Sequence, residues 1–249
     1  MFTPAFANFT ASFDYFEIDV RDQISTLGAG AIVGSCYSLP NFPNAFCDLF
    51  NRVGTGANPL NIEFIRDSYL NINKQLVRGY DLNLRWDGDF NFGKVEVESQ
   101  FTYTMENVEQ LFDSSLESGF DSNDYVGLIS YPKLVGNVRS SLTRGDFTYT
   151  WGMRYVDETE NFNFTQPAAY FGNPNPVYDT VAEDRLYHSL SVRYAADSWT
   201  LLVGVDNVLD KDPPTVSTGT ATRYGNIPAF ATQYDWFGRS LFARMTYRF

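Results

Sequence analysis

Hydrophobic and polar residues alternate along most of the chain, which is the pattern of β-strands with two different faces. From 147 to 155 every second residue is Phe, Tyr, Trp or Met, and the residues between are small or polar. The eight strands that the pattern predicts cover 6–24, 69–87, 93–106, 130–144, 146–159, 184–195, 198–209 and 236–249. Most exceed the ~5–6 residues usual in soluble sheets and suit a tilted membrane crossing of ~9–11 residues.

The first predicted strand departs from simple alternation. Its apolar residues change parity between Phe13 and Phe16. This change indicates either a β-bulge or a register different from the one assigned.

The predicted connections alternate in length along the chain. Three are short turns: Asp87–Gly93, Arg144–Asp146 and Ala195–Ser198. The long ones cover approximately 25–68, 107–129, 160–183 and 210–235. Short periplasmic turns on one edge and long external loops on the other are typical of bacterial outer-membrane barrels. The fold class expected is therefore all-β, an antiparallel transmembrane β-barrel section.

The two faces of these strands are expected to meet different surroundings. The apolar face, with Tyr and Trp near strand ends, suits outer-membrane lipid. The charged residues of the polar face are Arg85, Arg139, Arg154, Arg193, Arg244, Arg248, Glu96, Glu98 and Asp206. An Arg facing lipid would cost ~2–4 kcal/mol at the bilayer midplane, so this face is expected to line the lumen. A soluble β-sandwich that binds carbohydrate would instead bury the apolar face against a second sheet.

Composition excludes several function classes. A net charge of −12, with only 18 Lys and Arg among 249 residues, argues against a nucleic-acid partner. The single histidine, His188, leaves no Ser/His/Asp arrangement and no Cys/His metal cluster, and no Gly-rich phosphate loop is present. We predict no enzyme activity, no cofactor and no metal site. No apolar run reaches the ~18 residues of a transmembrane helix.

The two cysteines lie close together in the sequence. Cys36 and Cys47 flank ten residues rich in Pro and Asn. A local disulfide in an oxidising compartment is the leading interpretation, and two unrelated thiols are the alternative.

Two long loops contain candidate ligand contacts. Loop 160–183 holds aromatic residues among Asn and Pro, which suit sugar rings or a flat chelate; they are Phe162, Phe164, Tyr170, Phe171 and Tyr178. Loop 107–129 holds Glu109, Asp113, Glu117, Asp121 and Asp124 without Lys or Arg. The acidic loop could hold a divalent cation. The alternatives are a self-packed aromatic loop and a solvated acidic loop.

Four segments resemble TonB-dependent outer-membrane receptors. "LLVGVDNVLDKDPP" (Leu201–Pro214) and "YDWFGRSLFARMTYRF" (Tyr234–Phe249) are similar to the end of such receptors. "FDYFEIDVRDQI" (Phe13–Ile24) and "NINKQLVRGYDLNL" (Asn71–Leu84) are similar to two of their strands. The paired-cysteine loop resembles one in a large proteobacterial group of these receptors. Both glycines of these segments are expected to serve folding: Gly204 lies in a strand where a side chain would lack room, and Gly238 loosens the entry to the last strand.

The resemblance implies an energised uptake receptor in the bacterial outer membrane, with a siderophore, corrinoid, haem or oligosaccharide as ligand. The resemblance implies a complete receptor with a barrel of about 22 strands. An N-terminal plug domain that contacts TonB would fill this barrel. We recognise neither a plug domain nor a signal peptide, so residues 1–249 are expected to be the C-terminal part of a receptor. Tyr247 and Phe249 resemble the signal read by the barrel assembly machinery. The alternative is a self-contained eight-stranded barrel with a structural or adhesive role, which would require the first and last strands to pair.

Overall fold

The computed structural model describes most of the chain and divides it into two units. The described residues are 8–39, 41–55, 60–110, 123–161, 179–217, 222–223, 227–228 and 233–248. Unit 1 takes its residues from 1–16, 78–105 and 126–249, and unit 2 from 17–77 and 106–125. Among the described residues, no helix is both long and apolar enough to cross a bilayer.

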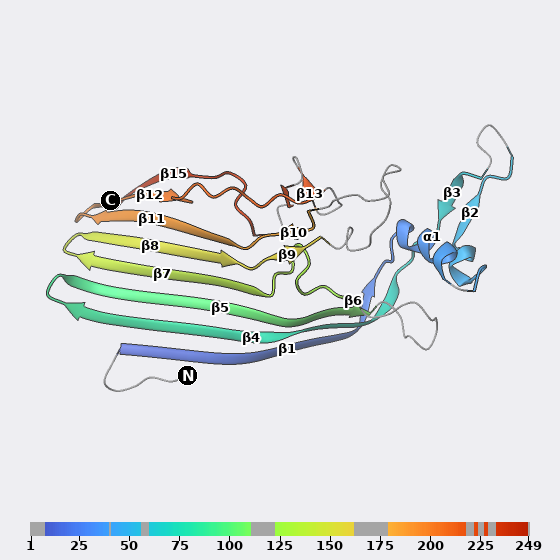
Figure 1. Ribbon diagram of the computed structural model, residues 1–249, viewed down its shortest axis with the longest axis horizontal. Helices are drawn as coiled ribbons and strands as arrows, with labels where there is room; N and C mark the ends of the chain where they lie inside the picture. Colours follow the sequence, from blue (N-terminus) through green and yellow to red (C-terminus); the bar gives the residue numbers. More distant parts are fainter. Residues whose placement is uncertain are drawn as a thin grey trace. The chain divides into compact units, whose positions relative to one another are not determined.

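The main sheet confirms the eight predicted strands (Figure 1). In sheet order they are β1 (Asn8–Ser25), β4 (Leu70–Phe90), β5 (Gly93–Gln110), β7 (Leu134–Arg144), β8 (Phe147–Val156), β11 (Arg185–Ala195), β12 (Trp199–Asp206) and β15 (Ser240–Tyr247). From β5 onward each strand is antiparallel to the next. A short strand, β6 (Asn123–Asp124), pairs with the end of β5.

Short turns join the strands at one end of the sheet, which we call the turn end. Strands β7 and β8 are joined by Gly145 and Asp146, and Gly145 has a φ of +55° that glycine adopts readily. Strand β4 runs to Phe90, so the turn before β5 is shorter than the predicted 87–93. The rings of Phe90 and Phe92 stack at 5.1 Å across this turn, which favours the longer strand.

The first strand keeps one register along its unit 1 portion. Asn8 Nδ2 donates to Asp87 Oδ2 (3.2 Å) and Asn83 Nδ2 donates to Ser12 Oγ (3.3 Å). Phe16 lies beside Gly79, where an added Cβ would come within 2.8 Å of the Phe16 ring. Each pair is four residues from the last on both strands, so no bulge lies between Asn8 and Phe16. Phe16 therefore lies on the polar face, and the register alternative is the correct one.

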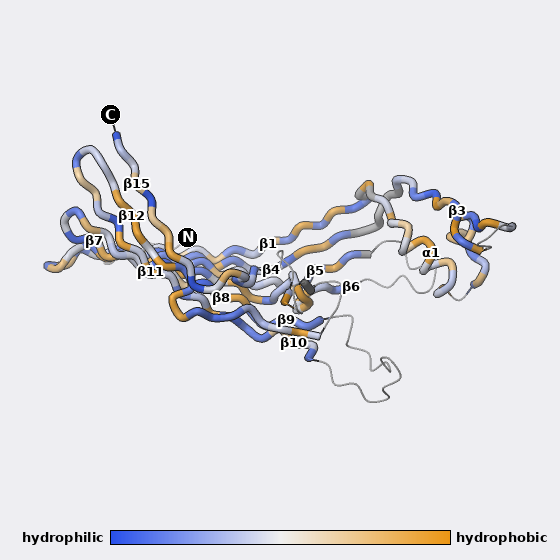
Figure 2. The backbone as a smooth tube through the Cα atoms, turned by 90° about the horizontal axis from the view of Figure 1, so that it is seen from above, coloured by the Kyte–Doolittle hydropathy of each residue, from blue (hydrophilic) through white to orange (hydrophobic). Residues whose placement is uncertain are grey.

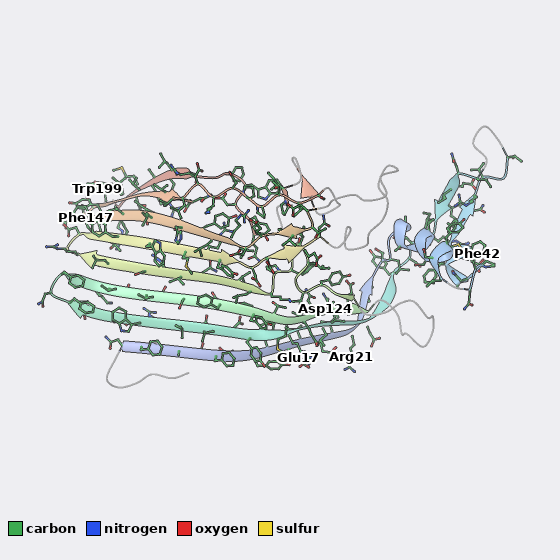
Figure 3. All side chains as sticks on the ribbon, in the orientation of Figure 1. Glu17, Arg21, Phe42, Asp124, Phe147 and Trp199 are labelled. Carbon is green, nitrogen blue, oxygen red and sulfur yellow. A yellow bond between two sulfur atoms is a disulfide. The ribbon has the colours of Figure 1, made fainter. Side chains whose placement is uncertain are left out.

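The sheet of unit 1 has one apolar and one polar face, as the alternation predicted. Figure 2 shows hydrophilic and hydrophobic positions alternating along its strands. Large apolar side chains remain exposed on the apolar face; they include Tyr149, Trp151, Leu190, Val192, Val203 and Leu241. At the turn end, the ring of Tyr194 lies 4.8 Å from Phe147 and 5.2 Å from Trp199 (Figure 3). No second sheet of comparable size covers this face among the described strands.

The opposite end of unit 1, the loop end, contains a small buried core. Its residues are Ile129, Val156, Ala182, Val216 and Tyr234. Two short strands, β9 (Thr159–Glu160) and β10 (Val181–Ala182), pair beside it. Strands β13 (Thr222–Arg223) and β14 (Ile227–Pro228) form another short pair. The described connections at this end are therefore packed together.

Unit 2 contains regular structure within the long connection predicted over 25–68. Its elements include the helix α1 (Ala29–Ser38), the 3₁₀ helix η1 (Ala45–Leu49), and the hairpin of β2 (Phe50–Arg52) and β3 (Ile62–Ile65). Cys36 and Cys47 form the predicted disulfide, which joins α1 to η1. Asn44 caps η1 and donates to the Ser35 carbonyl at the end of α1 (3.2 Å). The long connection predicted over 25–68 is therefore present between β1 and β4, and it contains a helix and a hairpin that the alternation did not predict.

Candidate functional site

The polar face of unit 1 forms a groove with a volume of about 1040 Å³. Every strand of the main sheet contributes a lining residue. In sheet order, one from each strand is Thr10, Asn83, Gln100, Asn137, Thr150, Ser189, Asp206 and Ser240. Because side chains alternate between faces, the same period that exposes apolar residues on one side gathers these polar groups on the other.

Cross-strand register sets the charge pattern of the groove. Glu98 lies directly opposite Arg139 on the neighbouring strand, and its carboxylate is 3.6 Å from Arg85 Nη1. Glu98 therefore has an arginine on each of its two neighbouring strands. An exposed ion pair of this kind contributes only ~0–1 kcal/mol, so its main effect is on the local charge. The predicted polar-face residues Arg85, Arg139, Arg154, Glu98 and Asp206 all line the groove.

At the loop end of the groove, Arg154 holds the segment that precedes the last strand against the sheet. Its guanidinium lies 4.7 Å above the Tyr187 ring and donates to the Gln233 carbonyl. The Tyr187 hydroxyl in turn accepts the backbone N–H of Asp235 (3.1 Å). Residues from β8 and β11 thus hold the chain that leads into the last strand.

The two C-terminal segments of the sequence contact each other here. Asn207, just after β12, has a φ of +50° and donates to Asp235 Oδ2 (2.8 Å). It also exchanges hydrogen bonds with the backbone of Lys211, at 2.9 Å and 2.8 Å. Asp210 Oδ1 accepts the backbone N–H of Arg239 (2.8 Å). These contacts hold the chain on either side of the loop between β12 and β15.

Two glycines of these segments fit the folding role expected for them. A Cβ on Gly204 would come within 2.3 Å of the Phe242 ring across the strand pair. Gly238 has a φ of +69°, which side chains other than glycine adopt at a cost.

Tyr234 anchors the buried core at the loop end. Its side chain is almost fully buried, and its hydroxyl lies 3.1 Å from Thr159 Oγ1. Burial raises the pKa of the Tyr234 phenol, because the charged form would lose its hydration, and the Thr159 hydrogen bond opposes this in part. The phenol is therefore neutral wherever the core is intact at ordinary pH.

Most ligand contacts predicted from the sequence lie outside the described residues. These are Phe162, Phe164, Tyr170, Phe171 and Tyr178, together with Asp113, Glu117 and Asp121 of the acidic loop. Of that loop, Asp124 accepts the backbone N–H of Asn107 (3.2 Å) in the β5–β6 pairing. Within the described ranges, no three His, Cys, Asp or Glu side chains gather as metal ligands.

The terminal aromatic signal is described only in part. Tyr247 lies opposite Trp199 in the pairing of β12 with β15, and Phe249 is outside the described residues. The assembly role of these two residues stays a prediction.

Sequence reasoning missed two groups of residues. One is the fastening formed by Arg154, Tyr187 and Asn207, for which alternation gives no signal beyond their polarity. The other is an aromatic surface in unit 2 that includes Tyr37 and Phe42. A run of 25 residues without any Asp, Glu, Lys or Arg, 23–47, was a usable signal for this second group.

Comparison with solved structures gives receptors and a transporter of similar fold. The siderophore receptor PirA of Acinetobacter baumannii aligns with a TM-score of 0.57 at 17% identity, over 97% of this chain and 30% of that chain. A mutant of the ferric enterobactin receptor PfeA of Pseudomonas aeruginosa gives 0.54 at 16% identity, over 96% and 29%. The iron transporter FrpB of Neisseria meningitidis gives 0.51 at 10% identity, over 95% and 28%. The chain thus spans about 30% of the length of PirA.

Comparison with curated protein sequences gives no match. The family model for the TonB-dependent receptor-like β-barrel matches residues 2–208, which is most of the chain. Proteins of this family are transport receptors and not enzymes. The chain belongs to the TonB-dependent receptor β-barrel family.

Proposed function

We propose that this chain is the C-terminal wall section of a TonB-dependent receptor that imports a scarce, bulky nutrient through the outer membrane. The proposal rests on the match of the family model to residues 2–208. The described strands form a sheet with two open edges. Among the described strands, β1 pairs only with β4, and β15 pairs only with β12. A wall section of a wider barrel needs such edges, whereas a self-contained eight-stranded barrel has none.

In this proposal the apolar face contacts outer-membrane lipid. Its exposed Trp, Leu and Val side chains would otherwise face water over a continuous area. The rings of Phe147, Tyr194 and Trp199 at the turn end suit the membrane–water interface on the periplasmic side. The barrel assembly machinery would act on the last strand, which ends at Tyr247, and on the aromatic signal predicted at Tyr247 and Phe249.

The polar groove would face the plug domain and TonB would act through that plug. Arg85, Arg139 and Asp206 line the groove and need either water or polar partners. A plug that fills the lumen can supply such partners.

The transported ligand is proposed from the relatives and from the loop composition. PirA is named a siderophore receptor and PfeA a ferric enterobactin receptor, which favours a ferric siderophore as the first ligand to test. A corrinoid, haem or an oligosaccharide are the other classes. Aromatic contacts are expected from Tyr170 and Phe171 of loop 160–183.

Uptake measurements test the proposal. Cells that carry the intact gene, cells without it, and cells without TonB are supplied with radioactive iron bound to a panel of siderophores. The proposal expects accumulation of at least one complex that is lost in both mutants. If accumulation of siderophores, haem, corrinoids and oligosaccharides is the same in all three strains, the transport function is wrong.

A further inference from the structure

Unit 2 contains a small folded segment that we call the disulfide module, residues 27–67 as far as they are described. Its core is formed by Cys36, Leu39 and Phe46, each less than a tenth exposed, with Leu49 and Phe50 packed against it. The Cys36–Cys47 disulfide crosses this core. At its base the backbone N–H of Gly28 donates to Asp67 Oδ2 (3.1 Å). The module thus has its own core and its own covalent closure.

One surface of the module carries a group of aromatic rings, the ring platform, made by Tyr37, Phe42 and Phe50. Tyr37 stacks on Phe42 with ring centres 5.5 Å apart and planes 23° apart. Phe50 lies 6.3 Å from Tyr37 at a tilted angle. The side chains of Phe42 and Tyr37 are 60% and 51% exposed. Phe42 is labelled in the part of Figure 3 that shows unit 2. Two large rings thus present apolar surface to solvent.

Arg52 lies over this platform and is held there from two sides. Its Cζ is 5.7 Å from the Tyr37 ring centre and 5.6 Å from that of Phe50. Its Nε and Nη2 donate to the Tyr37 hydroxyl at 3.3 Å and 3.0 Å, and its Nη1 donates to the Leu60 carbonyl. The guanidinium is therefore fixed in place before any ligand arrives.

The Arg52 guanidinium keeps capacity for an anion. Of its five N–H groups, the described contacts use three, which leaves one on each terminal nitrogen. A carboxylate is the natural acceptor for these remaining guanidinium N–H groups. Among the described residues Arg52 forms no ion pair, and residues 27–47 of the module contain no charged side chain.

We propose that the ring platform and Arg52 bind a flat aromatic group that carries a carboxylate or a similar anion. The aromatic ring would pack on Phe42 and Tyr37, and the anion would accept hydrogen bonds from the two terminal nitrogens of Arg52. A neutral ring would leave the guanidinium without an anion, and an aliphatic acid would leave the exposed rings in water. The pre-set geometry lowers the ordering cost of binding. A role of this site in nutrient capture rests on the proposed transport function, whereas binding itself does not.

Three small probes separate the two parts of the site. Naphthalene-2-carboxylate has the ring and the anion, naphthalene-2-carboxamide has the ring alone, and cyclohexanecarboxylate has the anion alone. Binding is measured by ligand-observed NMR on the protein purified from membranes and placed in lipid nanodiscs, with empty nanodiscs as the blank. Charge-assisted hydrogen bonds and ring packing each support a preference of about 10-fold for the carboxylate over either control probe.

Matched variants locate the binding. Phe42→Ala removes an exposed ring that is not part of the module's core, and Arg52→Gln removes the charge. Each substitution is expected to weaken the binding of naphthalene-2-carboxylate by about 10-fold. Arg52→Lys keeps the charge but lacks the planar pair of terminal nitrogens. Its affinity for naphthalene-2-carboxylate should lie between that of Arg52→Gln and that of the unchanged protein. Phe64→Ala is the control, because Phe64 is an exposed ring beside Arg66 on the same hairpin but opposite Asn51 rather than Phe50. Mass spectrometry confirms the disulfide in every variant.

Each outcome of this experiment supports or removes the site. The site is supported if the protein prefers naphthalene-2-carboxylate, if Phe42→Ala and Arg52→Gln abolish this preference, and if Phe64→Ala keeps it. Equal binding of the three probes, or a preference that Phe42→Ala leaves unchanged, overturns it. Intact probe binding in a protein that fails the uptake test would keep the site and reject the transport function.

Discussion

The sheet of unit 1 and the disulfide module of unit 2 are built on opposite principles. In the sheet, apolar residues such as Trp151 and Leu241 remain exposed on one face, and polar residues such as Arg139 line a groove on the other. In the module, apolar residues gather inside around a disulfide, as they do in small secreted domains. We therefore expect the sheet to depend on its surroundings for stability, and the module to depend on its own core and disulfide.

Removal of the disulfide should have the largest effect, and it should destabilise the disulfide module without destabilising the sheet of unit 1. For Cys36→Ser with Cys47→Ser, closure of a short loop predicts that the module loses about 2–4 kcal/mol, which is most of what a small core can supply. Hydrogen exchange should become fast in α1 and the β2–β3 hairpin and stay slow in β7 and β8. Equally fast exchange in both regions would show that the module is not independent of the sheet.

A pair of glycine substitutions sharpens the same comparison. A Cβ on Gly79 in β4 would come within 2.2 Å of the backbone oxygen of Tyr103, so Gly79→Ala should destabilise the sheet by about 1–3 kcal/mol. Gly30 in α1 has open space around it, so Gly30→Ala should stabilise the helix by about 0.5–1 kcal/mol. Chemical unfolding in lipid or detergent, followed separately by tryptophan fluorescence and helix exchange, measures both. The two substitutions are expected to change the free energy of unfolding in opposite directions. A change in the same direction for both would contradict the comparison.

The fastening at the loop end of the sheet predicts a smaller, local effect. Asn207 is buried, has a positive φ and donates to Asp235, so Asn207→Ala should cost about 1–2 kcal/mol. Exchange should rise for 233–239 and stay unchanged in the disulfide module. Asn207→Asp keeps the oxygen that accepts the Lys211 N–H (2.8 Å) but places a second carboxylate against Asp235, so exchange at 233–239 should rise at least as much as in Asn207→Ala. A variant that exchanges as slowly as the unchanged protein would remove Asn207 from the fastening.

The smallest effect concerns the pH dependence of the loop-end core. The pKa of Tyr234 is raised by burial, so its contribution to stability is complete below the unfolded pKa of about 10 and is lost as pH rises through the folded pKa. Exchange at 157–161 should therefore accelerate above about pH 10 more than hydroxide catalysis explains. Tyr234→Phe should remove this extra dependence and cost about 1 kcal/mol at neutral pH for the Thr159 hydrogen bond. If the exchange of 157–161 in Tyr234→Phe depends on pH as it does in the unchanged protein, a group other than Tyr234 causes the acceleration.

The sequence predicts the sheet better than the module because alternation is a local signal. Each strand from β4 to β15 repeats with period two, and a side chain's face follows directly from its parity. Phe16 shows where this reasoning fails: it lies on the polar face because Gly79 on the next strand leaves room for its ring. That room depends on a neighbour 63 residues away, which parity within one strand does not report.

The helix α1 escaped prediction for a different reason. Its ten residues, AGAIVGSCYS, contain two glycines and no charged side chain, so they show no polar stripe of period 3.6. The disulfide and the Asn44 contacts hold it in place. Similarly, the groove charges at Arg85, Arg139 and Asp206 followed from parity, but the contact of Arg154 with Gln233 required knowledge of how a distant loop folds back. The aromatic contacts predicted in 162–178 remain predictions.

The central claim is that this chain forms part of the wall of a wider barrel, and the size of the native protein tests it most directly. An antibody to the β2–β3 hairpin is used to detect the protein in the outer-membrane fraction of cells that carry the intact gene. The account predicts a band about three times heavier than the 28.3 kDa of this chain, because the chain spans 30% of the length of PirA. A band at 28.3 kDa that shifts on boiling would contradict it, since it would indicate a closed barrel made of this chain alone.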